Sequence, residues 1–432
     1  MIPRHHAAAA VMPGFPPEAD SRAGSASGVR FLGLTLAFMV FLVPVVYSEL
    51  SVNYGFVLLP CGWVLLTGGF RRVPRLFQGA VLVFSCIFFA SFLGQIQLYG
   101  FTVRRTISFL LFLTYFSYVV VPLSAISVRA FKWAVVGIGL LYAVASAALF
   151  FSLGGAELHF GAKDMVGDQR FGFVYIMGAW IVYFSRARGL AAVTGKWLVI
   201  TVLLGGVLLT FSRGAIVALV GSVVLFTMVY PLRWLTRPSV RGLWGAAGTL
   251  AVAVVLGVCL RVFLPTTFDF FGERLFQLDR TLSEATNPDA SAGVRVEIAK
   301  AIVGYVSGHP LTGSGYLGVW ILPDAPAETN SAHNQYTDVL FRTGFLGLAV
   351  YLYLLARLMR WLFRGQPALF WGMVATLIYC FFHDIFKESE GAFVLAFCFG
   401  LLAQALRERH PKLQAGAKGG PVIAWGEGRT GA

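Results

Sequence analysis

The sequence predicts an all-α polytopic membrane protein with about twelve transmembrane helices and a large outer (periplasmic) loop containing short helices. Hydrophobic residues make up 57% of the 432 residues and charged residues only 12%, whereas soluble domains carry about 25% charged residues. Mean hydropathy is +0.75. The apolar residues fall in runs of roughly 17–22, the length of helix that crosses about 30 Å of hydrocarbon. These runs do not alternate apolar and polar residues as the strands of a membrane β-barrel do, and a helix satisfies its own backbone hydrogen bonds.

The apolar runs have boundaries good to a few residues. They are 31–48, 52–69, 77–97, 106–124, 131–152, 171–185, 197–211, 214–230, 243–264, 337–362, 367–386 and 391–406.

The positions of the basic residues predict the orientation of these helices. A formal net charge of +14 can indicate nucleic-acid binding, but Lys and Arg cluster in alternate short connections between the apolar runs. That distribution is the positive-inside rule, so it predicts no nucleic-acid partner and places both termini in the cytoplasm. Arg104 and Arg105 are an exception to the alternation.

Five parts of the chain follow from this topology. They are a disordered cytoplasmic tail at 1–29, transmembrane helices 1–9 at 30–264, a large periplasmic loop at 265–336, transmembrane helices 10–12 at 337–406, and a cytoplasmic tail at 407–432. The tail at 1–29 is not expected to be a cleavable signal, because its charges lie too far from the first apolar run. The five cysteines lie singly in apolar runs without CxxC spacing, which is typical of packing residues rather than disulfides or metal ligands.

The large loop has its own helical pattern. Apolar residues recur at helical spacing from 294 to 305, with Ser291 as a possible cap and Gly308-His309-Pro310 as a stop. This pattern predicts a short helix that lies on the membrane or against the transmembrane bundle.

Arg213 is unusual because it separates two apolar runs with almost no loop. An arginine at the centre of a membrane helix costs about 2.5–3.5 kcal/mol on insertion scales, and less near an interface. It is either a snorkelling interfacial residue or a ligand-binding one. Its predicted outward position favours binding, because the sorting rule requires no charge there, and the small neighbours Ser212 and Gly214 leave room for a ligand. A guanidinium fork matches phosphate oxygens.

Arg295 is the second candidate cation, on the predicted loop helix. An arginine on a helix surface beside Glu297 or Asp289 is also ordinary. Arg261 and Arg342 lie near predicted outer helix ends, and either can serve as the second cation instead.

His333 and Asn334 stand just before a long apolar run. A histidine there is either a solvated loop residue or a cap, or it is a general base at the outer surface. Asn334 can cap the helix or orient a neighbouring group. Asp338 can set the tautomer of the His333 ring only if the local chain is not regular helix.

Other residues of the loop are candidates for supporting roles. His309, beside Pro310, is expected to shape a turn rather than to catalyse. Gly313 and Gly315 belong to a GSG sequence too short to be a phosphate-binding loop. His159 and His383 are expected near the outer surface, the latter beside Asp384. No His pair has the spacing of a metal site, and HExxH, Walker and DxD patterns are absent, so no metal and no cofactor are predicted.

Three stretches resemble the O-antigen ligase and O-antigen polymerase family of bacterial envelope glycosyltransferases. They are TFSRGAIVALV (210–220), RVEIAKAIVGYVSGHPLTGSGYLG (295–318) and SAHNQYTDVLFRTGFLGLAVYLYL (331–354). The order of these stretches, their hydrophobic surroundings and the large loop before a His-Asn helix start all match the family.

The resemblance implies a metal-independent, integral-membrane glycosyltransferase of the inner membrane. Such enzymes take a glycan from undecaprenyl diphosphate on the outer face and pass it to lipid A core, to a growing glycan or to a protein. By similarity, Arg213 and Arg295 hold the diphosphate and His333 activates the acceptor hydroxyl. The motifs do not separate ligase from polymerase, and the partners implied are the lipid-linked donor, the glycan or lipid A-core acceptor, and membrane lipid.

The physical reading of the residues agrees with this chemistry. No nucleotide is available outside the cytoplasmic membrane, so the donor must arrive already activated, and a lipid diphosphate is such a donor. The competing class is a transporter, for example a flippase for lipid-linked glycans. The sequence shows no internal repeat and no paired broken helices of the kind found in many transporters.

Overall fold

The computed structural model describes residues 73–99, 126–152, 171–229, 261, 291–322, 332–387 and 389–408. Within these ranges every regular element is a helix and no strand occurs, which confirms the all-α class. The α-helices are α3 (Arg75–Tyr99), α6 (Val128–Ser152), α8 (Gly172–Phe184), α9 (Leu190–Leu209), α10 (Arg213–Val229), α15 (Ser291–Gly308), α16 (Gln335–Gly365), α17 (Pro367–Tyr379) and α18 (Ser389–Glu408). Two short 3-10 helices, η6 (Val319–Ile321) and η7 (Ile385–Lys387), complete the described structure.

The helices coincide with eight of the expected spans, those beginning at 77, 131, 171, 197, 214, 337, 367 and 391. The expected spans 31–48, 52–69 and 106–124 lie outside the described residues, as do the span 243–264 apart from Arg261, the tail at 1–29 and nearly all of the tail at 407–432. Among the described helices, α6, α9 and α16 are long and apolar enough to cross a membrane. The total of twelve spans remains a prediction.

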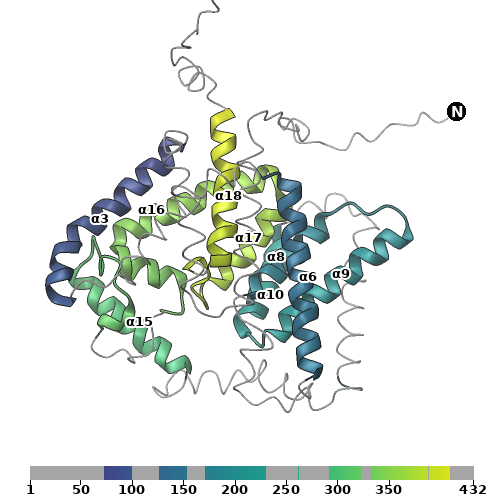
Figure 1. Cartoon of the computed structure of the whole chain (residues 1–432), viewed down its shortest axis with the longest axis horizontal. Coiled ribbons are helices and arrows are strands. Elements are labelled where there is room, and N and C mark those ends of the chain that lie inside the picture. The colour runs from purple at the N-terminus through teal and green to yellow at the C-terminus, as the bar shows by residue number, and fades with distance from the viewer. Residues whose placement is uncertain are drawn as a thin grey trace, which may run out of the picture.

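The described helices form two groups that meet at α16, α17 and α18 (Figure 1). In the first group α8 is the central helix and packs against α17, α9 and α6, while α10 packs against α17. Small residues allow this close packing, because a Cβ on Gly372 of α17 would lie 2.7 Å from Met177 Cγ of α8. Residues 172–182 of α8 are all buried for this reason.

The second group joins α15 to α16 and confirms the helix expected within the large loop. Ile298, Ile302 and Val306 form one apolar face of α15, and they pack with Val319 and with Phe341 of α16. The helix ends at Gly308, directly before His309 and Pro310, as the stop signal predicted.

A kink in α16 receives the loop that follows α15. Gly344 has φ +65°, and a Cβ at this position would lie 2.5 Å from the carbonyl carbon of Leu311. The amide of Phe345 donates to the carbonyl of Pro310 at 2.8 Å. The kink therefore depends on glycine for both its backbone angle and its close contact with the loop.

Gly344→Ala is expected to destabilise the protein, because positive φ and steric overlap each cost roughly 1–3 kcal/mol. The measurement is thermal unfolding of the purified protein in detergent. The matched control is Gly304→Ala on α15, where a Cβ would meet open space, so alanine should be neutral or stabilise the helix slightly. Equal melting temperatures for the two variants would contradict the role of the kink.

Candidate active site

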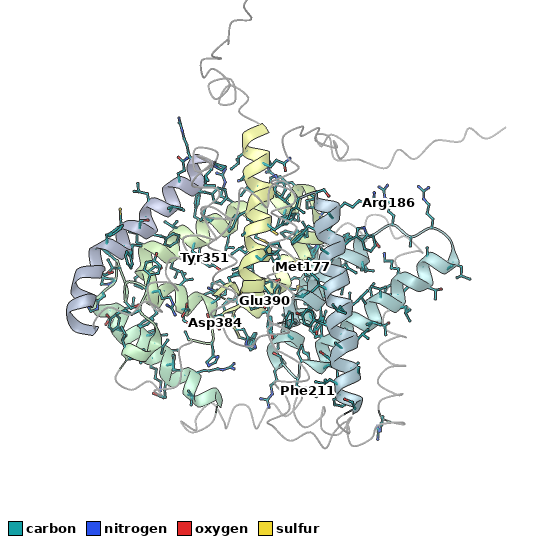
Figure 2. The ribbon with its side chains drawn as sticks, in the orientation of Figure 1. Met177, Arg186, Phe211, Tyr351, Asp384 and Glu390 are labelled. Carbon is teal, nitrogen blue, oxygen red and sulfur yellow. The ribbon has the colours of Figure 1, made fainter. Side chains whose placement is uncertain are left out.

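The candidate site is built around the turn that joins α17 to α18, which we define as residues 379–387. The expected span at 367–386 ends early in the structure, since α17 stops at Tyr379 and the chain turns through Cys380–Phe382. Ile385 and Phe386 are buried, and η7 packs against α18. The turn thereby presents Asp384 between the two groups of helices (Figure 2).

The first element to reach the 379–387 turn is the start of α10. The hydroxyl of Tyr379 donates to Ser212 Oγ at 3.1 Å, and His383 Nε2 lies 3.4 Å from the same oxygen. The Tyr379 and His383 rings also contact each other, with centroids 4.7 Å apart. Ser212 is only 5% exposed, so these partners fix the residue that directly precedes Arg213.

Local backbone geometry holds Arg213 at the first position of α10. The connection from α9 is so short that Phe211 takes φ +49°, an uncommon angle for a residue other than glycine. The Ser212 carbonyl and hydroxyl oxygens then accept from the first amides of α10, including Ala215 N. A Cβ on Gly214 would lie 2.7 Å from Phe382 Cβ, so glycine lets this helix start touch the 379–387 turn. Figure 2 places Phe211 at the end of the molecule opposite Arg186.

The second element is α15, through Arg295. Burial lowers the pKa of the Arg295 guanidinium, while the nearby Tyr379 and Asp384 act in the opposite direction. Asp384 is only 9% exposed. Arg295 does not use the ordinary partner that its own helix offers, because the Glu297 carboxylate pairs with Lys300 at 2.7 Å. The two predicted arginines therefore stand on elements that converge at Tyr379.

The third element is the start of α16, which carries His333 and Asn334. The Asn334 side chain caps the helix by accepting from Tyr336 N at 2.9 Å and Thr337 N at 3.2 Å. The next residue, Gln335, bonds the turn through both its backbone and its side chain. Gln335 N donates to Cys380 O and Gln335 Oε1 accepts from Phe386 N, each at 2.9 Å.

His333 therefore stands two positions before Gln335, the residue that bonds the 379–387 turn, and its backbone has φ +51°. Positive φ at a residue other than glycine persists only where the surroundings enforce it, and such residues cluster at functional sites. Asp338 does not set the tautomer of the His333 ring, because it lies in regular helix and its Oδ2 accepts from Arg342 Nε at 2.8 Å.

The supporting residues of the loop lie elsewhere. Gly313 and Gly315 have φ +57° and +59°, and the loop between them packs on the kink of α16, where Ser314 N donates to Phe341 O at 2.6 Å. His309 is exposed and stacks on Tyr305 with ring centroids 4.8 Å apart. These residues shape the loop after α15.

The alternative cations have different surroundings. Arg342 bonds Asp338 and donates from Nη1 to the Tyr316 carbonyl at 3.0 Å, so it ties the same loop to α16. Arg261 is exposed. Among the described residues, no three His, Cys, Asp or Glu side chains gather closely enough to hold a metal ion, and metal-free chemistry remains a prediction.

Reasoning from sequence missed the importance of Tyr379, His383 and Asp384. A span of twenty residues was expected to run through them, although a His-Asp pair at the end of an apolar run is itself a signal. Hydropathy averages over such a pair, because neighbouring Phe and Ile residues keep the window apolar.

Comparison with known proteins supports the resemblance drawn from the three motifs. The curated proteins include no significant match to the chain. The family model described as O-antigen ligase matches residues 197–352, from within α9 to within α16. This segment contains Arg213, Arg295 and His333, while the 379–387 turn lies beyond it. Residues 197–352 of this helical membrane protein are therefore similar to the O-antigen ligase family.

Proposed function

We propose that the protein transfers a glycan from undecaprenyl diphosphate to an acceptor hydroxyl on the outer face of the bacterial inner membrane, as an O-antigen ligase or a polymerase of O-antigen or exopolysaccharide. The single observation that carries this proposal is the convergence of two arginine-bearing elements at Tyr379. Its hydroxyl bonds the residue before Arg213, and the same group lies within electrostatic range of Arg295.

The arginines bind the donor diphosphate. Each guanidinium offers a planar fork that pairs two N–H groups with phosphate oxygens. The diphosphate gains negative charge as the glycosidic bond breaks, and cations already held in place stabilise that charge in the transition state. Tyr379 and Asp384 act electrostatically on Arg295, while Glu297 of the same helix pairs with Lys300.

His333 acts as the general base. A neutral imidazole nitrogen takes the proton of the acceptor hydroxyl while its oxygen bonds to the anomeric carbon. The bond from that carbon to the diphosphate oxygen breaks, and undecaprenyl diphosphate leaves with the electron pair. A single displacement of this kind inverts the anomeric centre and needs no metal or other cofactor.

Arg213→Lys and Arg295→Lys are expected to lower transfer strongly, because lysine keeps the charge but loses the fork. Turnover with purified lipid-linked donor, together with the amount of folded protein, is the measurement. Arg186→Lys, at an exposed position at the opposite end of the molecule, is the matched control. Near wild-type transfer by both variants would make the arginines topological anchors and move the diphosphate site to Arg261 or Arg342.

His333→Ala is expected to lower turnover by about 10²–10⁴-fold, the usual contribution of a general base. Donor binding should stay nearly constant, because the arginines hold the diphosphate. His309→Ala provides the control, since that exposed ring stacks on Tyr305. A wild-type enzyme that loses activity in excess chelator would overturn the metal-free mechanism, and an active His333→Ala variant would remove His333 from the chemistry.

Tyr379→Phe is expected to weaken donor binding about 2- to 10-fold, because one hydrogen bond to Ser212 contributes about 0.5–1.5 kcal/mol. The effect should appear in the KM for the donor and should largely vanish in an Arg213→Lys background, since Tyr379 bonds the residue that directly precedes Arg213. Tyr336→Phe is the control, as it removes a 2.8 Å bond to Leu377 O between α16 and α17. Fully additive losses in the double variant would argue that Tyr379 does not position the arginines.

A further inference from the structure

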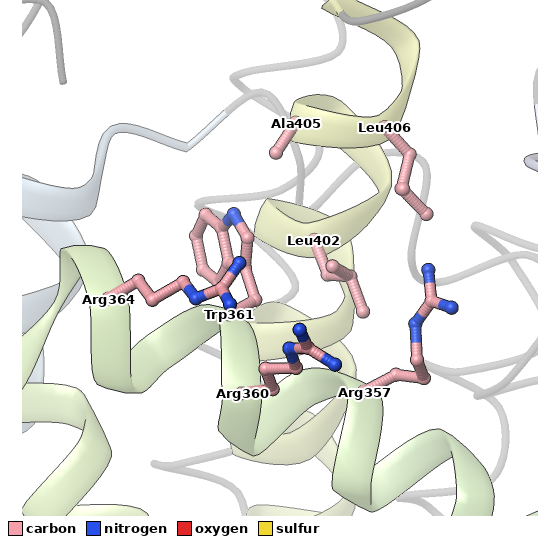
Figure 3. Close-up of a pocket in the computed structure, with 7 residues that line it drawn as sticks. All are labelled: Arg357, Arg360, Trp361, Arg364, Leu402, Ala405 and Leu406. Atoms are coloured by element: carbon pink, nitrogen blue, oxygen red, sulfur yellow. The ribbon is translucent and has the colours of Figure 1, made fainter. Parts of the chain in front are cut away.

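A pocket of about 310 Å³ opens between the C-terminal part of α16 and α18 (Figure 3). Arg357, Arg360 and Arg364 line it from α16, at helical spacing that places all three on one side. From Gln335 to Arg357 the chain advances 22 residues, or about 30 Å of helix. Because the kink at Gly344 interrupts this path, the predicted orientation rather than helix length assigns the pocket to the cytoplasmic side, opposite the candidate active site.

The three arginines concentrate positive charge in a small space. All three are exposed, and no carboxylate in the described part of the chain pairs with any of them. Arg357 alone has a polar contact there, with its Nη1 3.4 Å from the Tyr353 hydroxyl and its guanidinium 5.9 Å from the centre of that ring. Three neighbouring guanidinium groups repel one another, and an anion between them would relieve that repulsion.

The opposite wall of the pocket is apolar. Leu402 and Leu406 line it from α18, and the half-buried ring of Trp361 on α16 lies beside the Arg364 guanidinium (Figure 3). A soluble anion would gain nothing from these side chains. A phosphate group attached to an acyl chain would use both walls.

We propose that this pocket binds the head group of an anionic phospholipid of the cytoplasmic leaflet, with an acyl chain along the α18 side. The arginine forks match phosphate oxygens, and the volume suits a head group rather than a whole lipid. The predicted orientation agrees, because basic connections mark this end of the bundle as cytoplasmic, and anionic lipids attract basic groups there. The site is independent of the proposed transfer reaction.

The positive-inside rule alone also places arginines at this end, so the experiment must separate lipid binding from sorting. Purified full-length protein in detergent is titrated with dioleoylphosphatidylglycerol or dioleoylphosphatidylcholine, and bound lipid is counted by native mass spectrometry. Arg360→Gln/Arg364→Gln is expected to weaken phosphatidylglycerol binding about 10- to 30-fold, from roughly a three- to fivefold effect per charge. Arg186→Gln/Arg188→Gln removes two exposed charges outside the pocket and should leave binding unchanged.

A triple change to lysine at 357, 360 and 364 keeps the charge needed for insertion. It should still weaken binding about 3- to 10-fold, because lysine lacks the fork, and it keeps the test valid if the glutamine variant fails to insert. Inorganic phosphate at millimolar concentration should not displace the lipid. Three outcomes would each overturn the proposal. They are displacement of the lipid by phosphate, equal binding of the two lipids, and binding that is unchanged in both the lysine variant and the glutamine variant.

Discussion

The hydrogen bond from Tyr379 to Ser212 is the contact on which the rest of the candidate site depends. It joins the last residue of α17 to the residue before Arg213, across 167 positions of sequence. Because Tyr379 also lies within electrostatic range of Arg295, one side chain relates α17, α15 and the start of α10. Gln335 attaches α16 to the same turn, because its backbone amide donates to Cys380 O and its side-chain Oε1 accepts from Phe386 N. Without the 379–387 turn, α10, α15, α16 and α17 would still carry the candidate residues but would share no contact that brings all four together.

The sequence predicted the helices well, because hydropathy and length report directly on the environment of a membrane span. It also predicted α15 within the loop, since Ile298, Ile302 and Val306 keep helical spacing even where the chain becomes polar. Arg213, Arg295 and His333 could be chosen individually from the sequence, because each is a basic or titratable residue at the edge of an apolar run or on the predicted loop helix. Their relation to one another could not be read, because it runs through Tyr379, Gln335 and Cys380, which are ordinary residues in an apolar stretch. Contacts between distant segments leave no local periodicity.

The glycine-rich loop shows how the same pattern can have a different physical cause. Glycines at 313 and 315 invite comparison with phosphate-binding loops, but their backbone angles serve the approach to Phe341 and the kink at Gly344. Arg342 likewise has a structural role, because it forms an ion pair with Asp338 and its Nη1 donates to the Tyr316 carbonyl. A basic residue or a glycine near a site therefore needs its contacts known before it receives a role.

The lengths of α8 and α17 have a consequence for the bilayer itself. Each contains 13 residues, or about 20 Å of helix, against roughly 30 Å of hydrocarbon. The two helices lie side by side at the centre of the bundle. Either the lipid around them becomes thinner or their ends stay recessed below the surface. In both cases the end of α17 at Tyr379 would lie below the level of the surrounding bilayer surface, and the proposed lipid-linked donor would reach the 379–387 turn from within the bilayer.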